Sequence, residues 1–178
     1  MTLPNFITIA RFIMVPLIIL ALLDGHMLAA FVLFLLAGVS DGLDGFIARH
    51  FNQSSELGSW LDPIADKLLL VSVFIMLGWI EALPRWLVVL AVSRDGLIVG
   101  AVMLSSLMGN PVGMRPLMVS KANTLFQILL IGLVLADLAK IAPLDGITRW
   151  MVFAVAGLTI ASASAYLVTW LRHMAGEK

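Results

Sequence analysis

Apolar residues occur along this chain in long, nearly uninterrupted segments, and short polar stretches separate them. A helix needs about 20 apolar residues to cross the hydrocarbon core of a membrane. Segments close to that length are Ile7–Leu23, Leu28–Arg49, Leu57–Ile80, Trp86–Met108, Ser120–Ala139 and Ile147–Leu171. The stretches between them are rich in glycine, proline and charged residues, which favour turns. The pattern predicts an all-α integral membrane bundle of six transmembrane helices, formed as one domain over residues 1–178.

The composition agrees with a membrane environment. Of the 178 residues, 61% are hydrophobic and only 12% are charged, and the mean hydropathy is +1.06. A soluble domain carries about 25% charged residues, which it needs to cover its surface. The net charge is zero and no basic tract is present, so nothing indicates nucleic-acid binding. Because the chain has no cysteine, disulfides, thiolate metal ligands and cysteine nucleophiles are excluded.

The basic residues favour one orientation of the six predicted spans. An even number of spans places both termini on the same side of the membrane. With cytoplasmic termini, the inside carries Arg49, Arg115, Lys121, Arg172 and Lys178, and the outside carries Arg85, Lys140 and Arg149. Cytoplasmic loops carry an excess of Lys and Arg, so this orientation is favoured. We expect a protein of the bacterial inner membrane, with the loop after the second span in the cytoplasm.

Four aspartates interrupt the apolar pattern. Asp41 and Asp44 fall near the end of the second predicted span, and Asp62 and Asp66 near the start of the third. An aspartate at the centre of a membrane helix costs about 2.5–3.5 kcal/mol on insertion scales. Spacings of three and four residues place each pair on one helix face. Because a short loop joins the two spans, we expect the four carboxylates to face one another near the cytoplasmic surface.

Carboxylates gathered in this way repel one another unless a cation lies between them. Hard divalent cations prefer oxygen ligands, and two such ions about 3.5–4 Å apart are a common arrangement in phosphoryl chemistry. Gly45, Ala48 and Gly58 leave room for a large ligand beside the aspartates, and Arg49 is placed to reach a phosphate. Solvated helix ends and a cation pathway are the alternatives. The absence of a repeat and of paired broken helices argues against a transporter.

The same residues match a family pattern. The run Asp41-Gly-Leu-Asp44-Gly45-Phe-Ile-Ala48-Arg49, followed by Gly58, Asp62 and Asp66, fills every fixed position of D-x2-D-G-x2-A-R-x8-G-x3-D-x3-D. The chain therefore resembles the CDP-alcohol phosphatidyltransferases. This resemblance implies a homodimeric, six-helix membrane enzyme that transfers a phosphatidyl group from CDP-diacylglycerol to an alcohol and releases CMP.

The resemblance also implies a role for each residue of the motif. Two divalent cations, Mg²⁺ or Mn²⁺, would be bound by Asp41, Asp44, Asp62 and Asp66. Asp66 would in addition be the catalytic base that deprotonates the acceptor hydroxyl. The nucleotide would be bound by Asp44, Gly45, Ala48, Arg49 and Gly58.

Two branches of the family come close, and they differ in the acceptor alcohol. Arg94-Asp95, Ser120-Lys121-Ala122-Asn123-Thr124 and Ala161-Ser-Ala-Ser-Ala-Tyr166 resemble the cardiolipin synthase branch, whose acceptor is phosphatidylglycerol. The phosphatidylglycerophosphate synthases use glycerol-3-phosphate. They tend to have Arg-Glu in the fourth span, a second Arg where this chain has Val102, and Gly-Lys-x-Lys-Thr in the fifth. This chain lacks those features of the phosphatidylglycerophosphate synthases. Because a dianionic phosphate monoester usually attracts several Arg or Lys partners, their absence favours phosphatidylglycerol as the acceptor.

Three basic residues are candidates for binding the acceptor phosphate: Arg94, Lys121 and Arg115. Arg115 could supply a missing cation, so glycerol-3-phosphate stays a possible acceptor. For Arg94 and Lys121 the alternative is a structural role, either in charge pairing of the kind expected between Lys67 and Asp95 or with the charged group extended to the membrane interface. Arg11, in the first predicted span, is expected either to contact a lipid headgroup or to form an ion pair between packed helices.

Overall fold

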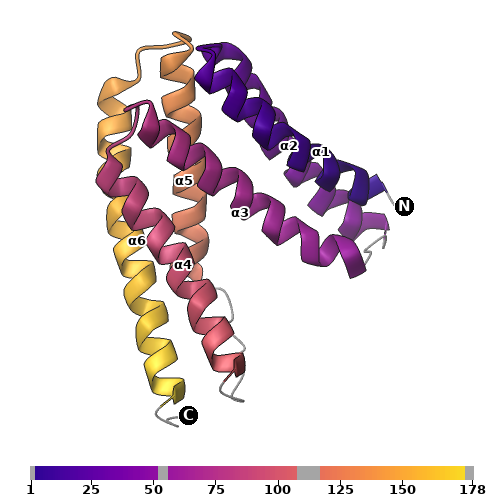
Figure 1. Cartoon of the computed structure of the whole chain (residues 1–178), viewed down its shortest axis with the longest axis vertical. Helices are drawn as coiled ribbons and strands as arrows, with labels where there is room; N and C mark the ends of the chain where they lie inside the picture. The colour runs from indigo at the N-terminus through magenta and orange to yellow at the C-terminus, as the bar shows by residue number, and fades with distance from the viewer. Residues whose placement is uncertain (1–2, 52–55, 108–116, 175–178) are drawn as a thin grey trace. The chain divides into compact units, whose positions relative to one another are not determined.

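The computed structural model describes residues 3–51, 56–107 and 117–174, with side chains for residues 9–40, 64–105, 107 and 117–174. Over these ranges the chain is all-α, as predicted, and contains no strand. The helices are α1 (Leu3–Leu23), α2 (Met27–Phe51), α3 (Glu56–Trp79), α4 (Arg85–Leu107), α5 (Met118–Leu138) and α6 (Asp145–Met174) (Figure 1). Each helix corresponds to one predicted span, and the bounds differ by at most four residues.

Three of these helices are long and apolar enough to cross a membrane. Within the described residues they are Arg85–Ser105 of α4, Met118–Leu138 of α5 and Asp145–Met174 of α6. The described apolar stretches of α1 and α2, Ile9–Leu23 and Met27–Ser40, are shorter. The structure thus supports a membrane protein with three candidate spans, and the number six stays a prediction.

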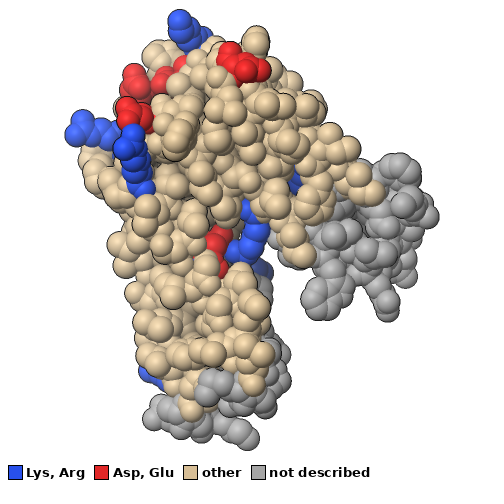
Figure 2. Space-filling model, viewed as in Figure 1, with Lys and Arg blue, Asp and Glu red and all other residues tan. Residues whose placement is uncertain are grey.

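Large apolar side chains are exposed on every helix. Examples are Ile13 at 57%, Leu97 at 63% and Met118 at 80%. Figure 2 shows broad uncharged areas on the described surface, with the charged atoms in small groups. Monomeric soluble proteins rarely expose apolar patches of this extent, whereas a lipid environment favours them.

The residues fall into two compact units, and the first comprises Met1–Ala82 and Ile131–Asp145. Here α1 packs against both α2 and α3. The buried side chains recur every three or four residues, as expected for one face of a helix. They are Val15, Ile18 and Leu22 of α1, Ala30, Phe34 and Ala37 of α2, and Leu69, Val73 and Leu77 of α3. The two alanines of α2 permit close approach of neighbouring backbones.

The second unit comprises Leu83–Leu130 and Gly146–Lys178, and so contains α4, the first part of α5 and nearly all of α6. Its buried face changes character along α6. Val152, Val155 and Ala156 are apolar, whereas the buried positions that follow are Thr159, Ser162 and Tyr166. On α4 and α5 the buried face likewise includes polar groups, Arg94, Asn123 and Gln127. The interior of this unit is therefore polar where these residues lie, and α4, α5 and α6 supply hydrogen-bond partners to one another.

Three helix ends share one stop motif. After α1, the His26 amide donates to the Ala21 carbonyl at 2.8 Å and the Gly25 amide to the Leu22 carbonyl at 3.3 Å, with Gly25 at φ +76°. This is the Schellman arrangement, which satisfies the last carbonyl groups of a helix. The ends of α3 and α5 repeat it, but there the left-handed residues are Glu81 at φ 60° and Lys140 at φ 56°.

These two non-glycine residues imply a stability test. Lys140→Gly is expected to raise the free energy of unfolding by roughly 0.5 kcal/mol. A side chain in the left-handed region costs about 1–2 kcal/mol, which glycine avoids. Part of this gain is offset because glycine loses more backbone entropy on folding. Gly25→Ala is expected to lower it by about 1 kcal/mol. Thermal unfolding in detergent, followed by circular dichroism, measures both changes. Lys140→Ala is the control; a gain equal to that of Lys140→Gly would show that backbone conformation is not the cause.

Candidate active site

The aspartate motif lies on α2 and α3. Asp41 and Asp44 belong to the second half of α2, which ends at Phe51, and Asp62 and Asp66 to the first half of α3, which begins at Glu56. The side chains of residues 41–63 lie outside the described part of the chain. The mutual approach of the four carboxylates, and the roles of Gly45, Ala48, Arg49 and Gly58, therefore stay predictions. Asp66 is the motif residue whose side-chain contacts the structure shows.

Asp66 forms an ion pair with Arg11. The Nη1 atom of Arg11, on α1, donates to Oδ1 of Asp66, on α3. The Arg11 side chain is completely buried, whereas 41% of the Asp66 side chain is exposed. A buried guanidinium without a partner costs several kcal/mol, so this pair joins α1 to α3 firmly. Of the two roles expected for Arg11, the structure shows the ion pair between packed helices.

The exposure of Asp66 suits a ligand-binding carboxylate. One oxygen is held by Arg11, while much of the side chain remains accessible. Among the described side chains, no group of three or more His, Cys, Asp or Glu residues is arranged to hold a metal ion. Of the four predicted ligands, only Asp66 belongs to this described set. Its carboxylate is a hard oxygen donor, the type that Mg²⁺ and Mn²⁺ prefer.

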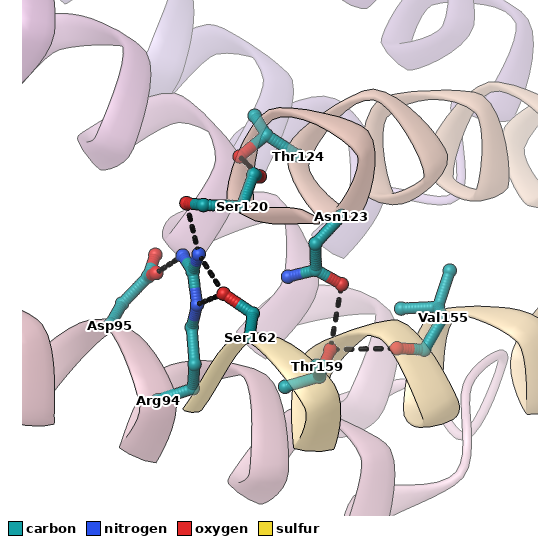
Figure 3. A network of polar contacts seen from close by, with 8 residues as sticks. All are labelled: Arg94, Asp95, Ser120, Asn123, Thr124, Val155, Thr159 and Ser162. Atoms are coloured by element: carbon teal, nitrogen blue, oxygen red, sulfur yellow. Dashed lines mark hydrogen bonds and ion pairs between the residues drawn. The ribbon is translucent and has the colours of Figure 1, made fainter. Parts of the chain in front are cut away.

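A second polar centre is built around Arg94 in the unit that contains α4 and α6 (Figure 3). Nη1 of Arg94 donates to Oδ1 of the adjacent Asp95 at 2.6 Å. Nε and Nη2 both donate to Oγ of Ser162 on α6, at 3.1 and 2.6 Å, and Nη2 also donates to Oγ of Ser120 on α5. Arg94 is 3% exposed. One guanidinium therefore links three helices, which its planar fork of donors allows.

The aromatic ring of Tyr166 completes the surroundings of Arg94. The Cζ atom of Arg94 lies 5.8 Å from the centroid of the Tyr166 ring. A cation at this distance from an aromatic face gains about 0.5–1 kcal/mol or more when shielded from water. Tyr166 follows Ser162 by four residues on α6, so both side chains lie on the same helix face.

A buried amide lies beside this centre. Asn123 of α5 is fully buried, and its Oδ1 atom lies 2.9 Å from Oγ1 of Thr159. The Nδ2 atom of Asn123 has no hydrogen-bond partner among the described residues. Figure 3 shows this nitrogen on the side of the amide that faces Arg94. A buried donor without a partner costs about 1–3 kcal/mol, so a ligand that accepts its hydrogen bond would recover that free energy.

The three predicted acceptor-binding residues differ in their settings. Arg94 is buried and paired, and Asp95 is one of its partners. Lys121 is exposed on α5, one residue after Ser120. Arg115 lies outside the described residues. The contact between Arg94 and Ser162 could not be predicted from the sequence, because the two residues lie 68 positions apart. Ser162 does belong to the Ala161–Tyr166 stretch, which resembles the cardiolipin synthase branch.

Comparison with known proteins agrees with the motif. The family model for CDP-alcohol phosphatidyltransferase matches residues 1–165. The chain belongs to this family.

Among curated proteins, similar chains carry the name cardiolipin synthase (CMP-forming). A fusion of this enzyme with a mitochondrial hydrolase in Schizosaccharomyces pombe is 35% identical over 94% of this chain and 31% of its own length. A probable enzyme of Drosophila melanogaster is 36% identical over 75% of this chain and 46% of its own length. The Streptomyces coelicolor enzyme is 39% identical over 55% of this chain and 48% of its own length. The chain thus spans about a third to a half of the length of these relatives.

The Arg94 centre gives a second stability prediction. Ser162→Ala removes the hydroxyl that accepts two of the guanidinium's hydrogen bonds, and is expected to lower the free energy of unfolding by about 1–3 kcal/mol. Ser164→Ala is the matched control, because Ser164 lies two residues away on α6 with an exposed side chain. Thermal unfolding in detergent compares the two variants. Equal midpoints would show that Arg94 does not depend on Ser162.

Proposed function

We propose that this chain is a cardiolipin synthase that transfers a phosphatidyl group from CDP-diacylglycerol to phosphatidylglycerol and releases CMP. The complete aspartate motif, the family and the names of the relatives support the proposal. The structural observation that carries it is the setting of Asp66. This carboxylate is fixed by buried Arg11 and remains accessible to a ligand, as a catalytic base requires.

In this proposal the motif binds two divalent cations and the nucleotide. Asp41, Asp44, Asp62 and Asp66 would hold the ions, and carboxylate oxygens are donors that Mg²⁺ or Mn²⁺ accepts. When bound, the ions would neutralise the negative charge that develops on the departing CMP. The pocket for the nucleotide would be formed by Asp44, Gly45, Ala48, Arg49 and Gly58. Small residues there let the nucleotide approach the helix backbone, and Arg49 would bind a phosphate oxygen.

The transfer is a displacement at the phosphorus of the phosphatidyl group. The terminal glycerol hydroxyl of phosphatidylglycerol attacks this phosphorus through its oxygen, and the bond from the phosphorus to the CMP oxygen breaks. The proton of the hydroxyl passes to the Asp66 carboxylate, without which the hydroxyl is a poor nucleophile. Arg11 holds Asp66 in position for this step and takes no part in the bond changes.

The Arg94 centre favours a weakly charged acceptor. Asp95 already balances the charge of Arg94, and the neighbouring Ser120 and Ser162 are neutral. A phosphodiester carries one negative charge and suits such a site, whereas a phosphate monoester with two charges usually attracts several cations. Lys121 and Arg115 would supplement Arg94 at the acceptor phosphate. Because Arg115 would add a cation, a phosphatidylglycerophosphate synthase that uses glycerol-3-phosphate is the second candidate.

The proposal includes a setting in the membrane. The six helices would all span the bilayer within a single domain of residues 1–178, with both termini and the aspartates on the cytoplasmic side of a bacterial inner membrane. Two copies would form a homodimer. A cation transporter would use the same carboxylates without consuming CDP-diacylglycerol, so measurement of CMP release separates that class from the enzyme.

CMP release from CDP-diacylglycerol by the purified full chain tests the proposal. With Mg²⁺ present, we expect turnover with phosphatidylglycerol and none with glycerol-3-phosphate. Chelation by EDTA should abolish the turnover and added Mg²⁺ should restore it. Turnover with glycerol-3-phosphate alone would favour the second candidate, and an absence of CMP with either acceptor would reject the enzyme class proposed.

Asp66→Asn is expected to lower kcat at least a hundredfold, because general base catalysis contributes roughly 10²–10⁴ to a rate. Asp24→Asn, which changes an exposed acid after α1, is the matched control and should keep full activity. Asp66→Asn also weakens the ion pair with Arg11. The unfolding midpoint and the affinity for CDP-diacylglycerol of this variant are therefore measured as well, to separate a loss of catalysis from a loss of folding or binding. Turnover within a few-fold of the unchanged chain would contradict the role of Asp66.

A further inference from the structure

An apolar groove runs between α4 and α6 in the second unit. Its volume is about 800 Å³. Its lining includes Gly96, Leu97, Gly100 and Leu104 of α4 and Tyr166 and Trp170 of α6. Gly96, Gly100 and Leu104 recur at intervals of four residues on α4, so the groove follows one face of that helix. The volume lies within the usual range for ligand sites, about 300–1,000 Å³.

Two glycines of α4 line the groove and face open space. A Cβ atom built on Gly96 or Gly100 would have no neighbouring atom within 4 Å. From Ser93 to Leu104 the groove spans 12 residues of α4, and the helical rise between these two residues is about 16 Å. One leaflet contributes about 15 Å to the hydrocarbon core. The groove therefore has the length of an acyl chain that lies within a single leaflet.

A hydrogen bond fixes Trp170, which lines the groove at the end away from Arg94. Nε1 of Trp170 donates to Oγ of Ser105 at 2.8 Å, and Oγ of Ser105 donates to the Ala101 carbonyl at 2.7 Å. Because its single polar group is satisfied in this way, the Trp170 indole presents an apolar wall to the groove. This contact links α6 to α4 at one end of the groove.

The opposite end of the groove meets the Arg94 centre. Tyr166 belongs to both, since its ring lines the groove and lies beside the Arg94 guanidinium. Ser120 and Ser162 accept hydrogen bonds from Arg94, and neither hydroxyl donates to another described residue. A hydroxyl can donate as well as accept, so both can still donate. With Nδ2 of Asn123, these donors suit a ligand rich in acceptor oxygens, such as a phosphate.

We propose that this groove binds an acyl chain of the acceptor lipid, phosphatidylglycerol, while the donors around Arg94 bind its phosphodiester. The inference rests on the proposed function and specifies where its lipid acceptor lies. An apolar groove of leaflet length that ends at a centre rich in hydrogen-bond donors matches a phospholipid, whose acyl chain is apolar and whose phosphodiester accepts hydrogen bonds. In the proposed orientation, α4 and α6 both run towards the cytoplasm, which places the groove in the cytoplasmic leaflet.

The phosphate end must supply most of the selectivity. Lipid tails are as apolar as leucine, so an acyl chain gains little hydrophobic free energy when it leaves the bilayer for the groove. The groove instead positions a lipid whose headgroup is held at Arg94. Filling it should therefore impair the lipid acceptor and leave a chain-free acceptor with the same headgroup unaffected.

Gly100→Leu tests this directly, because leucine would occupy the groove at mid-length. Gly157→Leu is the matched control: Gly157 is an exposed glycine of α6 away from the groove, and its added Cβ also meets nothing within 4 Å. Both changes favour the helix equally. For Gly100→Leu we expect the KM for dioleoyl-phosphatidylglycerol to rise roughly tenfold, which corresponds to about 1.4 kcal/mol of lost binding. The kcat/KM for glycerophosphoglycerol, the headgroup without acyl chains, should stay unchanged.

A binding measurement makes the test independent of turnover. Phosphatidylglycerol with a diazirine in one acyl chain, in phosphatidylcholine vesicles, should label peptides from α4 and α6 around Leu97 and Leu167 on irradiation. Unlabelled phosphatidylglycerol should reduce the labelling and extra phosphatidylcholine should not. Gly100→Leu should lose this competable labelling, and Gly157→Leu should keep it.

Several results would overturn the inference. Equal effects of the two leucine variants, or an equal loss with glycerophosphoglycerol, would show that the groove does not position an acyl chain. The Gly96–Gly100 spacing also suits helix contact between two copies. A disulfide between Leu97→Cys chains, which contain no other cysteine, would show that a second copy covers the groove. If no acceptor gives CMP, the proposed function fails, and the labelling alone decides whether phosphatidylglycerol binds there.

Discussion

An arginine inside an apolar protein core must find its partners within the chain, and both units of this structure are organised around one. Arg11 is fully buried and pairs with Asp66 across α1 and α3. Arg94 is almost as buried and binds Asp95, Ser120 and Ser162 from three helices. Because an unpaired buried charge costs several kcal/mol, these contacts determine which helix faces turn inward.

The same two contacts bring stability and proposed function together. Asp66 is both the partner of a structural arginine and the proposed catalytic base, so the ion pair that joins α1 to α3 also holds the proposed base in position. Around Arg94 the serine hydroxyls accept hydrogen bonds from the guanidinium, so in the proposed function their protons are available to a ligand. Preorganised donors of this kind do not need to reorient when a phosphate binds, which favours binding.

The extent of the apolar segments and the aspartate motif could be recognised from sequence because both are local patterns. The helix bounds follow from runs of apolar residues broken by turn-forming residues, and the three Schellman ends lie where those runs stop. The motif spans only 26 positions and occupies the adjoining halves of two consecutive helices. Sequence could not choose between a headgroup contact and an ion pair for Arg11, since its partner lies 55 residues away.

An all-helical chain, its family and the four aspartates of the motif can be recognised from the residue order alone. The packing of the helices is needed to see that Arg11 binds Asp66, that Ser162 lies against Arg94, and that a groove between α4 and α6 meets the Arg94 centre at Tyr166. The physical reason is that helix formation and motif spacing depend on neighbours along the chain. Partners of buried charges and the walls of a groove are set by packing between helices that lie far apart in sequence.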